Sequence, residues 1–349
     1  MCYDSFIDAQ PAMVSQRPIR FGILGAARIA PSALVQPAAS NPDVEVVAIA
    51  ARDRRRAREF AAANRIARVH QTYADLVADP DLDAIYNPLP NSMHCEWSLR
   101  ALAAGKHVLC EKPLASNAEE AARMAQAADD SGLLLVEGFH YRYHPLAHRI
   151  AELIRGGAIG KLTYVEGHFA VPIPSNNIRF DLKLAGGATM DLGCYPLHMI
   201  RSFSGMTPRV VAAHAQVGPP NIDVSMEADL ELAPGVTARM TCSMAADVQA
   251  GAYFLARGEH GEIRATNPIS PHRGHQLTVT TPAGTTTEAV PGEATFTYQL
   301  RAFVAAMRGD RAAFPTDARD GIIGMRIIDD VYRAAGLPPR GNPSVTSEG

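Results

Sequence analysis

Lys112 occupies the setting in this sequence that most favours chemistry. It lies in Cys110-Glu111-Lys112-Pro113, directly after a short apolar segment, 107–109, that predicts a strand. Ligands of an open parallel sheet bind outside the carboxyl ends of its strands, so we expect Lys112 to place a positive charge against a bound molecule. Pro113 stiffens the backbone after the lysine and favours one orientation. Taken alone, the motif fits equally a surface lysine at a strand-to-loop turn.

A glycine turn follows the first predicted strand, in the sequence Gly22-Ile-Leu-Gly-Ala-Ala-Arg-Ile-Ala30. Compared with the dinucleotide fingerprint G-x-G-x-x-G/A, Gly25 is the first glycine, and Ala27 and Ala30 replace the second and third. The first glycine serves the tight turn, and the second lets the backbone approach a pyrophosphate. The match is weak alone, but its position in the first βα turn of a βαβ series strengthens it.

The end of the second predicted strand bears on the choice of cofactor. An acidic residue there holds the ribose hydroxyls of NAD, whereas an arginine suits the 2′-phosphate of NADP. This chain has Ala50-Ala51-Arg52-Asp53. Arg52 favours NADP(H) over NAD(H), and Asp53 keeps NAD(H) open if the strand ends one residue later. The arginines that follow are expected on a solvated helix face.

The elements that would position these residues form two patterns. From Ile19 to about Glu137, short apolar runs alternate with Ala-rich amphipathic segments, which predicts a doubly wound Rossmann sheet of parallel strands. After about Arg142, alternating strands separated by turn signals predict an α+β domain with a large, mostly antiparallel open sheet. The predicted divisions are 1–17, a flexible extension; 18–139, a dinucleotide-binding domain; 140–340, a substrate and oligomerisation domain; and 341–349, a tail.

Composition limits the classes of function. The 349 residues are 47% hydrophobic and 20% charged, a composition typical of a globular protein, and the length favours two domains. The net charge of -3 gives no reason to expect nucleic acid or a membrane as partner. The five cysteines have no paired spacing, which favours reduced thiols and a cytoplasmic location. An exposed apolar face of the second sheet would bind another subunit, so a homodimer or homotetramer is expected.

Four segments in this order resemble the Gfo/Idh/MocA family of nicotinamide-dependent oxidoreductases: 22–27, 85–94, 105–113 and 191–196. Within the family, the stretch 46–53 and the tyrosine at 195 are similar to the NADP-using branch of dimeric dihydrodiol dehydrogenase, D-xylose dehydrogenase and glucose–fructose oxidoreductase. The resemblance covers about 17–338. The expected cofactor contacts are Gly25, Ala26, Ala27, Arg28, Ile29, Arg52, Asn87, Pro88, Leu89, Asn91, His94, Glu111 and Lys112.

The resemblance also implies catalytic roles. Lys112 matches the active-site lysine, which would stabilise a developing alkoxide, and Asp191 and Tyr195 match a D-x-x-x-[H/Y] pattern. Their i, i+4 spacing places both on one helix face. Since a free phenol titrates near pH ~10, we expect Lys112 to lower the pKa of Tyr195 so that it can exchange a proton. His198, one turn further on, is the alternative proton carrier.

The junction between the predicted domains supplies candidates for substrate binding. His140 stands where the family more usually has methionine, and with Arg142, Arg179 and His198 it is expected to bind substrate, although Arg179 fits a solvated loop equally well. His140, His144 and His148 are spaced at i, i+4, i+8, but Pro145 interrupts the helix that would align them, so no metal is expected.

Together these observations predict an NADP(H)-dependent oxidoreductase that moves a hydride between nicotinamide and a CH–OH or C=O carbon of a sugar, polyol or dihydrodiol. Two alternatives within the same chemistry are an NAD-dependent inositol or sugar dehydrogenase and a sugar ketoreductase. A third is a non-catalytic nucleotide or sugar sensor on the same scaffold, because a fold does not fix a function.

Overall fold

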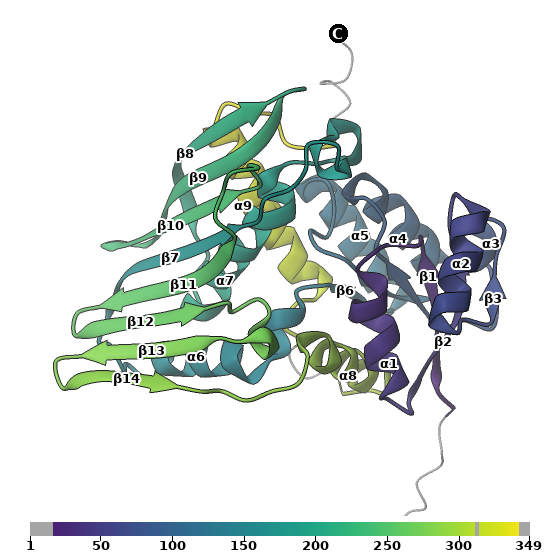
Figure 1. Ribbon diagram of the computed structural model, residues 1–349, viewed down its shortest axis with the longest axis horizontal. Coiled ribbons are helices and arrows are strands. Elements are labelled where there is room, and N and C mark those ends of the chain that lie inside the picture. The colour runs from purple at the N-terminus through teal and green to yellow at the C-terminus, as the bar shows by residue number, and fades with distance from the viewer. Residues whose placement is uncertain (1–16, 311–313, 342–349) are drawn as a thin grey trace, which may run out of the picture.

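The chain forms two sheets that lie side by side, with helices between and around them (Figure 1). The computed structural model describes residues 17–310 and 314–341. The expected N-terminal extension, apart from Arg17, and the expected tail, apart from Gly341, lie outside the described residues. The predicted fold class is confirmed, and the exact domain boundaries stay a prediction.

The first sheet has six parallel strands in the order β3-β2-β1-β4-β5-β6. Its central strands are short, apolar and buried on both faces, as expected for a parallel sheet covered by helices. Their bounds are β1 Ile19–Leu24, β2 Val44–Ala50, β3 Arg68–Val69, β4 Ala84–Asn87, β5 His107–Cys110 and β6 Leu135–Glu137.

Helices cover both faces of this sheet. One face packs against α4 (His94–Ala103) and α5 (Ala118–Ser131), and the other against α1 (Gln36–Ala39) and α8 (Thr295–Met307). Two further helices, α2 (Arg54–Asn64) and α3 (Tyr73–Val77), connect the strands at the β3 edge. The contact of Phe303 with Phe21, at 5.6 Å between ring centroids, shows that α8 returns to the first sheet although it follows the second in sequence.

The second sheet has eight strands in the order β14-β13-β12-β11-β7-β10-β9-β8. Only the β7–β10 pair is parallel among its pairings, which confirms the mostly antiparallel arrangement. The strands are β7 Leu162–Ala170, β8 Arg209–Gly218, β9 Ile222–Ala233, β10 Val236–Ser243, β11 Gly251–Gly258, β12 Gly261–Thr266, β13 Gln276–Thr281 and β14 Gly284–Glu288.

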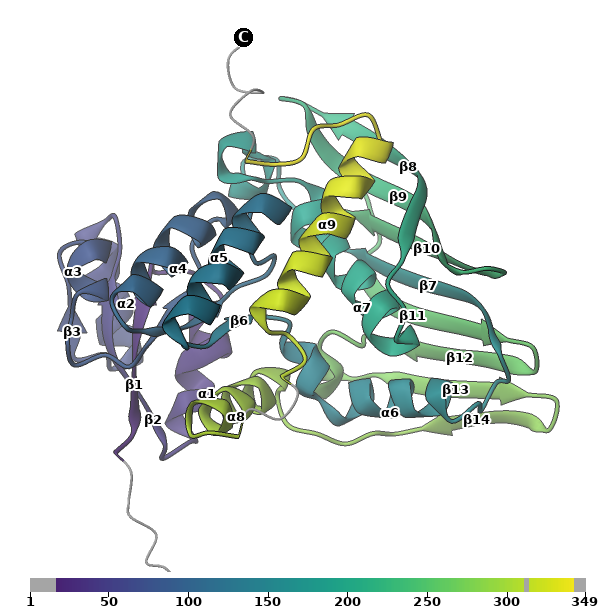
Figure 2. The same ribbon diagram turned by 180° about the vertical axis from the view of Figure 1, so that it is seen from behind.

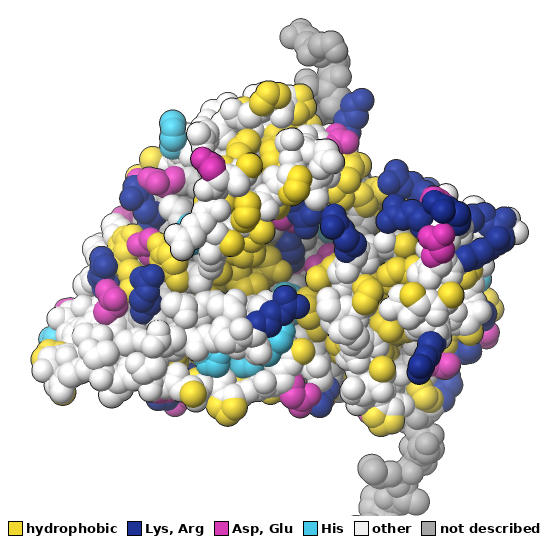
Figure 3. Space-filling view, in the orientation of Figure 1, with side chains coloured by type: hydrophobic (Ala, Val, Ile, Leu, Met, Phe, Trp, Pro, Cys, Tyr) yellow, Lys and Arg dark blue, Asp and Glu magenta, His cyan; other side chains and the backbone are white. Residues whose placement is uncertain are grey.

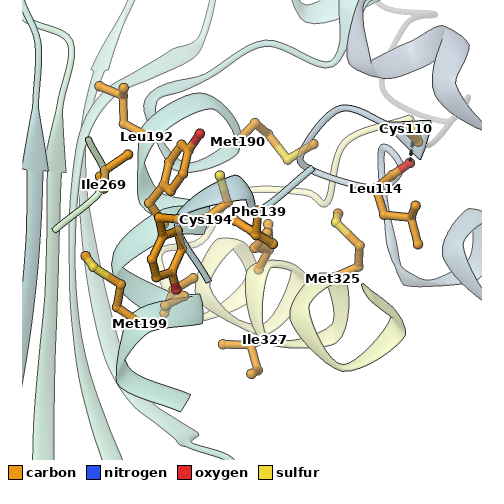
Figure 4. Close-up of a cluster of buried hydrophobic side chains, with 14 of the residues drawn as sticks. Cys110, Leu114, Phe139, Met190, Leu192, Cys194, Met199, Ile269, Met325 and Ile327 are labelled. Atoms are coloured by element: carbon orange, nitrogen blue, oxygen red, sulfur yellow. Dashed lines mark hydrogen bonds between the residues drawn. The ribbon is translucent and has the colours of Figure 1, made fainter. Parts of the chain in front are cut away.

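Three helices lie on one face of the second sheet, and Figure 2 shows them from behind: α6 (Pro145–Arg155), α7 (Cys194–Ser204) and α9 (Ala318–Ala334). Helix α9 contacts both α5 and β8, so it joins the two halves of the molecule. Figure 4 shows the buried cluster at this junction, where Leu114 and Phe139 approach Met325 and Cys194. The shared core fixes the strand ends of the first sheet relative to α7.

Candidate active site

A cleft of about 1610 Å³ lies between the carboxyl ends of the first sheet's strands and the second sheet. Figure 3 shows a hollow between the two halves, bordered by hydrophobic and basic side chains. The strand order reverses at β1 and β4, and open parallel sheets bind nucleotides at such a switch point. A single small-molecule site encloses about 300–1,000 Å³, so this cleft has room for two ligands.

The turn after β1 forms one wall of the cleft. Gly25 has a φ of 85°, which favours glycine, and a Cβ there would lie 3.1 Å from Cδ2 of Leu89. The close approach of this backbone to the turn after β4 therefore depends on a missing side chain, as the dinucleotide fingerprint requires. Lining this wall are the five expected residues Gly25, Ala26, Ala27, Arg28 and Ile29.

The residues at the tip of β2 bear on the choice between NADP(H) and NAD(H). Asp53 lines the cleft, but its side chain caps α2 by accepting hydrogen bonds from the Arg55 and Arg56 amides at 2.8 and 3.2 Å. Arg52 also lines the cleft and is exposed. The arginine is thus available to an anionic group, whereas the carboxylate is already engaged. This arrangement fits a 2′-phosphate better than a bare ribose.

The turn after β4 places all but one of the expected cofactor contacts of this segment at the cleft. Pro88, Leu89 and Asn91 line the cleft, but Asn87 is fully buried and donates to the backbone oxygen of His94 and to the Ser98 hydroxyl.

The His94 ring is fully buried as well. Its nitrogens lie 2.9 Å from the Pro113 carbonyl oxygen and 2.8 Å from that of Leu89, and burial lowers its pKa to about 4. His94 lines the cleft, as expected, whereas Asn87 does not. Both side chains hold the Pro88–Leu89 turn in place, and His94 also joins it to the segment that carries Lys112.

Lys112 projects from the end of β5 toward the start of α7. Its Nζ donates to the Asp191 backbone oxygen at 2.9 Å and lies 3.5 Å from Asp191 Oδ1. Burial is the largest single effect and acts to lower the pKa of Lys112, but Asp191, with smaller contributions from Cys194 and Glu111, raises that pKa above its usual value. For Asp191, burial is outweighed by Lys112 and Arg179, so its pKa is lowered. Both groups are therefore charged at neutral pH.

Tyr195 lies beside this pair, with its ring centroid 4.9 Å from Lys112 Nζ. The ammonium faces the ring rather than the hydroxyl, which lies 3.3 Å from His140 Nε2. Burial, with added repulsion from Glu111, raises the pKa of Tyr195 well above its usual range. The expected lowering of this pKa by Lys112 is therefore wrong for this geometry, because the lysine charge is directed at Asp191.

Glu111 is buried at the cleft wall and accepts a hydrogen bond of 2.7 Å from the buried Tyr86 hydroxyl. Of the four expected substrate residues, His140 and Arg179 line the cleft. Arg179 Nε pairs with Asp191 Oδ2 at 2.5 Å, so it is part of the charged cluster rather than of a solvated loop.

Arg142 and His198 were also expected to bind substrate, but neither lines the cleft. His198 is stacked on Phe139 at 4.0 Å and accepts or donates at 2.5 Å to Tyr141. Its Nε2 also lies 3.3 Å from Asp320 Oδ2. This ring packs on Phe139 and Tyr141, as Tyr195 also does, but it does not line the cleft, so it is not placed to contact substrate or to carry the proton.

Sequence reasoning missed the remaining lining residues. Many come from the ends of β7 and β12 and the loops after them, and Phe296 comes from α8; no motif marked a binding function at these positions. Among them are five apolar and two basic side chains: Phe169, Val171, Ile173, Ile269, Phe296, His272 and Arg273.

No group of three or more His, Cys, Asp or Glu side chains in residues 17–310 and 314–341 is arranged to hold a metal ion. His144 instead caps α6 by accepting from the Leu146 amide at 3.1 Å. In the same part of the chain, no helix is long and apolar enough to cross a membrane.

A Rossmann sheet with a glycine turn at its switch point, facing a paired lysine and aspartate beside a tyrosine, defines a nicotinamide-dependent oxidoreductase. Comparison with known proteins places this chain in one family. Residues 19–139 match the oxidoreductase family with an NAD-binding Rossmann fold, and residues 147–264 match the GFO/IDH/MocA C-terminal domain. The chain belongs to the Gfo/Idh/MocA oxidoreductases.

Three relatives cover nearly the whole chain. It is 35% identical to D-xylose 1-dehydrogenase (NADP(+)) 2 of Haloferax volcanii, over 90% of this chain and 97% of that protein. It is 33% identical to dTDP-3,4-didehydro-2,6-dideoxy-alpha-D-glucose 3-reductase of Streptomyces violaceoruber, over 92% and 96%. The 3-ketoreductase KijD10 of Actinomadura kijaniata, solved with NADP and TDP-benzene, superimposes with a TM-score of 0.84 at 30% identity, over 91% and 98%.

Proposed function

We propose that this protein is an NADP(H)-dependent oxidoreductase that moves a hydride between nicotinamide and a CH–OH or C=O carbon of a sugar, polyol or dihydrodiol. The observation that carries the proposal is the convergence of Lys112, Asp191 and Tyr195 in a cleft bounded by a dinucleotide turn. The named relatives support the same chemistry, since they include an NADP-dependent sugar dehydrogenase and sugar 3-reductases.

When bound, the nicotinamide dinucleotide supplies the two-electron redox chemistry. The residues of this chain bind it and control the proton. The turn Gly25–Ile29 and the tip of β2 would hold the dinucleotide, and Arg52 would bind the 2′-phosphate of NADP(H). Lys112 stabilises negative charge that develops on the substrate oxygen, and Asp191 keeps the ammonium in place and protonated.

Tyr195 is the proposed proton carrier. Burial keeps its phenol protonated at neutral pH, which suits donation to a carbonyl oxygen as the hydride reaches the adjacent carbon. In that step the C=O bond becomes C–OH, with the new hydrogen on oxygen drawn from Tyr195. A protonated phenol favours reduction. It therefore supports the second candidate, a sugar ketoreductase, whose chemistry is that of the 3-reductase relatives.

Assembly and location complete the proposal. The helices α6, α7 and α9 cover one face of the second sheet, and β8 exposes Val211 and Val217 with 56% and 44% of their surface accessible. We infer that the opposite face binds a second copy of this chain, giving a homodimer or homotetramer. Four free, buried cysteines among the described residues support a cytoplasmic location: Cys95, Cys110, Cys194 and Cys242.

A substrate panel tests the activity. Aldoses, inositols, dihydrodiols and keto-sugars are assayed with the purified full chain, following nicotinamide absorbance with NADP(H) and then with NAD(H). Lys112→Ala should lower kcat by about a hundredfold or more while leaving the Kd for NADPH nearly unchanged. Lys183→Ala, an exposed lysine outside the cleft lining, is the matched control and should behave as wild type.

Tyr195→Phe should lower kcat by about 10²–10⁴-fold. A Lys112→Ala protein that binds NADPH far more weakly but still turns over would contradict the assigned role. A wild-type protein that binds NADPH and a sugar but reduces nothing in the panel would favour the sensor alternative.

A further inference from the structure

The hydroxyl of Tyr195 lies next to a second polar pair, formed by His140 and Thr295. Only 5% of the tyrosine surface is accessible, and the nearest ammonium, Lys112, faces its ring. When the phenol gives its proton to a substrate, the resulting phenolate is left in a buried site. A buried anion is costly unless a hydrogen bond or a charge compensates it. The inference below rests on the proposed function and concerns the group that compensates this phenolate.

His140 is the side chain in hydrogen-bond contact with that oxygen. Its Nε2 lies 3.3 Å from the Tyr195 hydroxyl, and its Nδ1 lies 2.7 Å from Thr295 Oγ1. The ring packs against Phe296, with 3.9 Å between centroids, and is 4% accessible. His140 comes from the 3-10 turn His140–Tyr143 and Thr295 begins α8, so two separate elements hold the ring in one orientation.

The imidazole in this position is neutral. Burial, with smaller contributions from Lys112, His272 and Arg273, lowers its pKa to about 3. A neutral imidazole carries one proton, on either Nε2 or Nδ1. The hydroxyl on the Nδ1 side can donate as well as accept, so Thr295 is able to set the tautomer.

We propose that Thr295 donates to Nδ1 of His140 and thereby places the imidazole proton on Nε2, and that this N–H donates to the Tyr195 oxygen. The proton of Tyr195 is then free to point at the substrate. During reduction the Tyr195 O–H bond breaks, its proton goes to the substrate oxygen, and the electron pair stays on the phenolate, where the His140 N–H stabilises it. A water proton restores the phenol after the product leaves. His140 is thus a positioning residue that acts through Tyr195.

Paired variants separate this role from simple packing. His140→Leu removes the donor and should lower kcat by about tenfold to a hundredfold with little change in KM, because hydrogen bonds to charged groups are the stronger class. The apparent pKa of Tyr195 in the pH–rate profile should move to higher pH, because a phenolate without the His140 hydrogen bond forms less readily. His140→Gln keeps an N–H2 group and should recover most of both losses. His148→Leu, an exposed histidine on α6, is the control.

Nitrogen NMR reads the tautomer without any turnover. In protein labelled with ¹⁵N-histidine, the His140 signals are assigned by their loss in His140→Leu, and the proton is expected on Nε2. Thr295→Val should remove that preference, and Thr295→Ser should keep it. A proton on Nδ1 in the wild type would overturn the proposal, as would unchanged kcat and pH profile in His140→Leu. If the substrate panel shows no activity, the proposed function fails, and the tautomer still decides this inference separately.

Discussion

The sharpest test of how the cleft is held together is the buried ion pair between Arg340 and Asp223. Their side chains are 3% and 0% accessible, and Arg340 Nη2 lies 2.5 Å from Asp223 Oδ1. Arg340 Nε also donates to the Gly186 backbone oxygen at 2.9 Å, and the Thr189 amide donates to Asp223 Oδ2 at 2.7 Å. The pair therefore anchors the segment that leads directly into Asp191.

Arg340→Ala should destabilise the protein by about 3–5 kcal/mol, because removing one partner leaves an uncompensated buried charge. After the change Asp223 keeps hydrogen bonds from the Thr189 amide and, at 3.1 Å, from the Tyr332 hydroxyl, but no cation. Total stabilities of domains are about 5–15 kcal/mol, so the loss is large enough to move a denaturant midpoint clearly. Activity should fall as well, since Asp191 loses its fixed backbone.

Equilibrium unfolding in urea, followed by circular dichroism, measures this loss. Arg319→Ala is the matched control, because Arg319 and Asp129 form a pair 3.0 Å apart with 74% and 51% of their side chains accessible, worth about 0–1 kcal/mol. The double variant Arg340→Met with Asp223→Asn removes both charges and should lose less than Arg340→Ala alone. Equal losses for Arg340→Ala and Arg319→Ala would refute the reasoning.

Two further predictions concern the cofactor and the pH dependence. Arg52→Ala should raise the Kd for NADPH about tenfold or more and change that for NADH little, as measured by fluorescence titration, because only NADPH carries the 2′-phosphate; equal weakening of both would contradict this role. Glu137 is buried, and burial followed by repulsion from Asp320 raises its pKa to about 8. Between pH ~4 and ~8 the unfolded chain ionises this group while the folded chain keeps it protonated, so its contribution to stability is lost as pH rises through that window. Glu137→Gln, which still accepts from the Leu114 amide, should flatten this decline in urea midpoints measured across the window, and an unchanged slope would contradict the assignment.

The central strands of the first sheet could be predicted because each is marked by its own short run of apolar residues. The predicted strand at 107–109 lies within β5, His107–Cys110, since a buried parallel strand is a continuous, mostly apolar run. The strands β12 and β14 of the second sheet have a weaker signal in their own sequences. In β12, the polar Glu262 and Arg264 alternate with the buried Ile263 and Ala265 over only six residues, and β14 is almost entirely polar and exposed. Strands of this kind take their register from the neighbouring strand rather than from their own sequence.

Within the site, the structure places the three predicted catalytic residues in one cleft, but Lys112 pairs with Asp191 rather than with the Tyr195 hydroxyl. Motif spacing brought Lys112, Asp191 and Tyr195 into one cleft, but it did not show which of the two helical residues the ammonium would meet. Residues 189–193 form a π-helical turn before α7, so Asp191 and Tyr195 do not share one regular helical face. His198 was misplaced because helical spacing does not show where the cleft ends: its ring packs on Phe139, as Tyr195 also does, but lies outside the cleft lining.

The observed pairing restricts the chemistry available to Lys112. Schiff-base or nucleophilic catalysis by lysine needs a neutral amine, which burial or a neighbouring cation provides by lowering the pKa. In this cleft the Asp191 carboxylate, 3.5 Å away, raises the pKa of Lys112 despite its burial. The ammonium therefore stays protonated beside a phenol that burial also keeps protonated. Two protonated groups at one reacting oxygen can stabilise negative charge and donate a proton, which is what the reduction of a carbonyl requires.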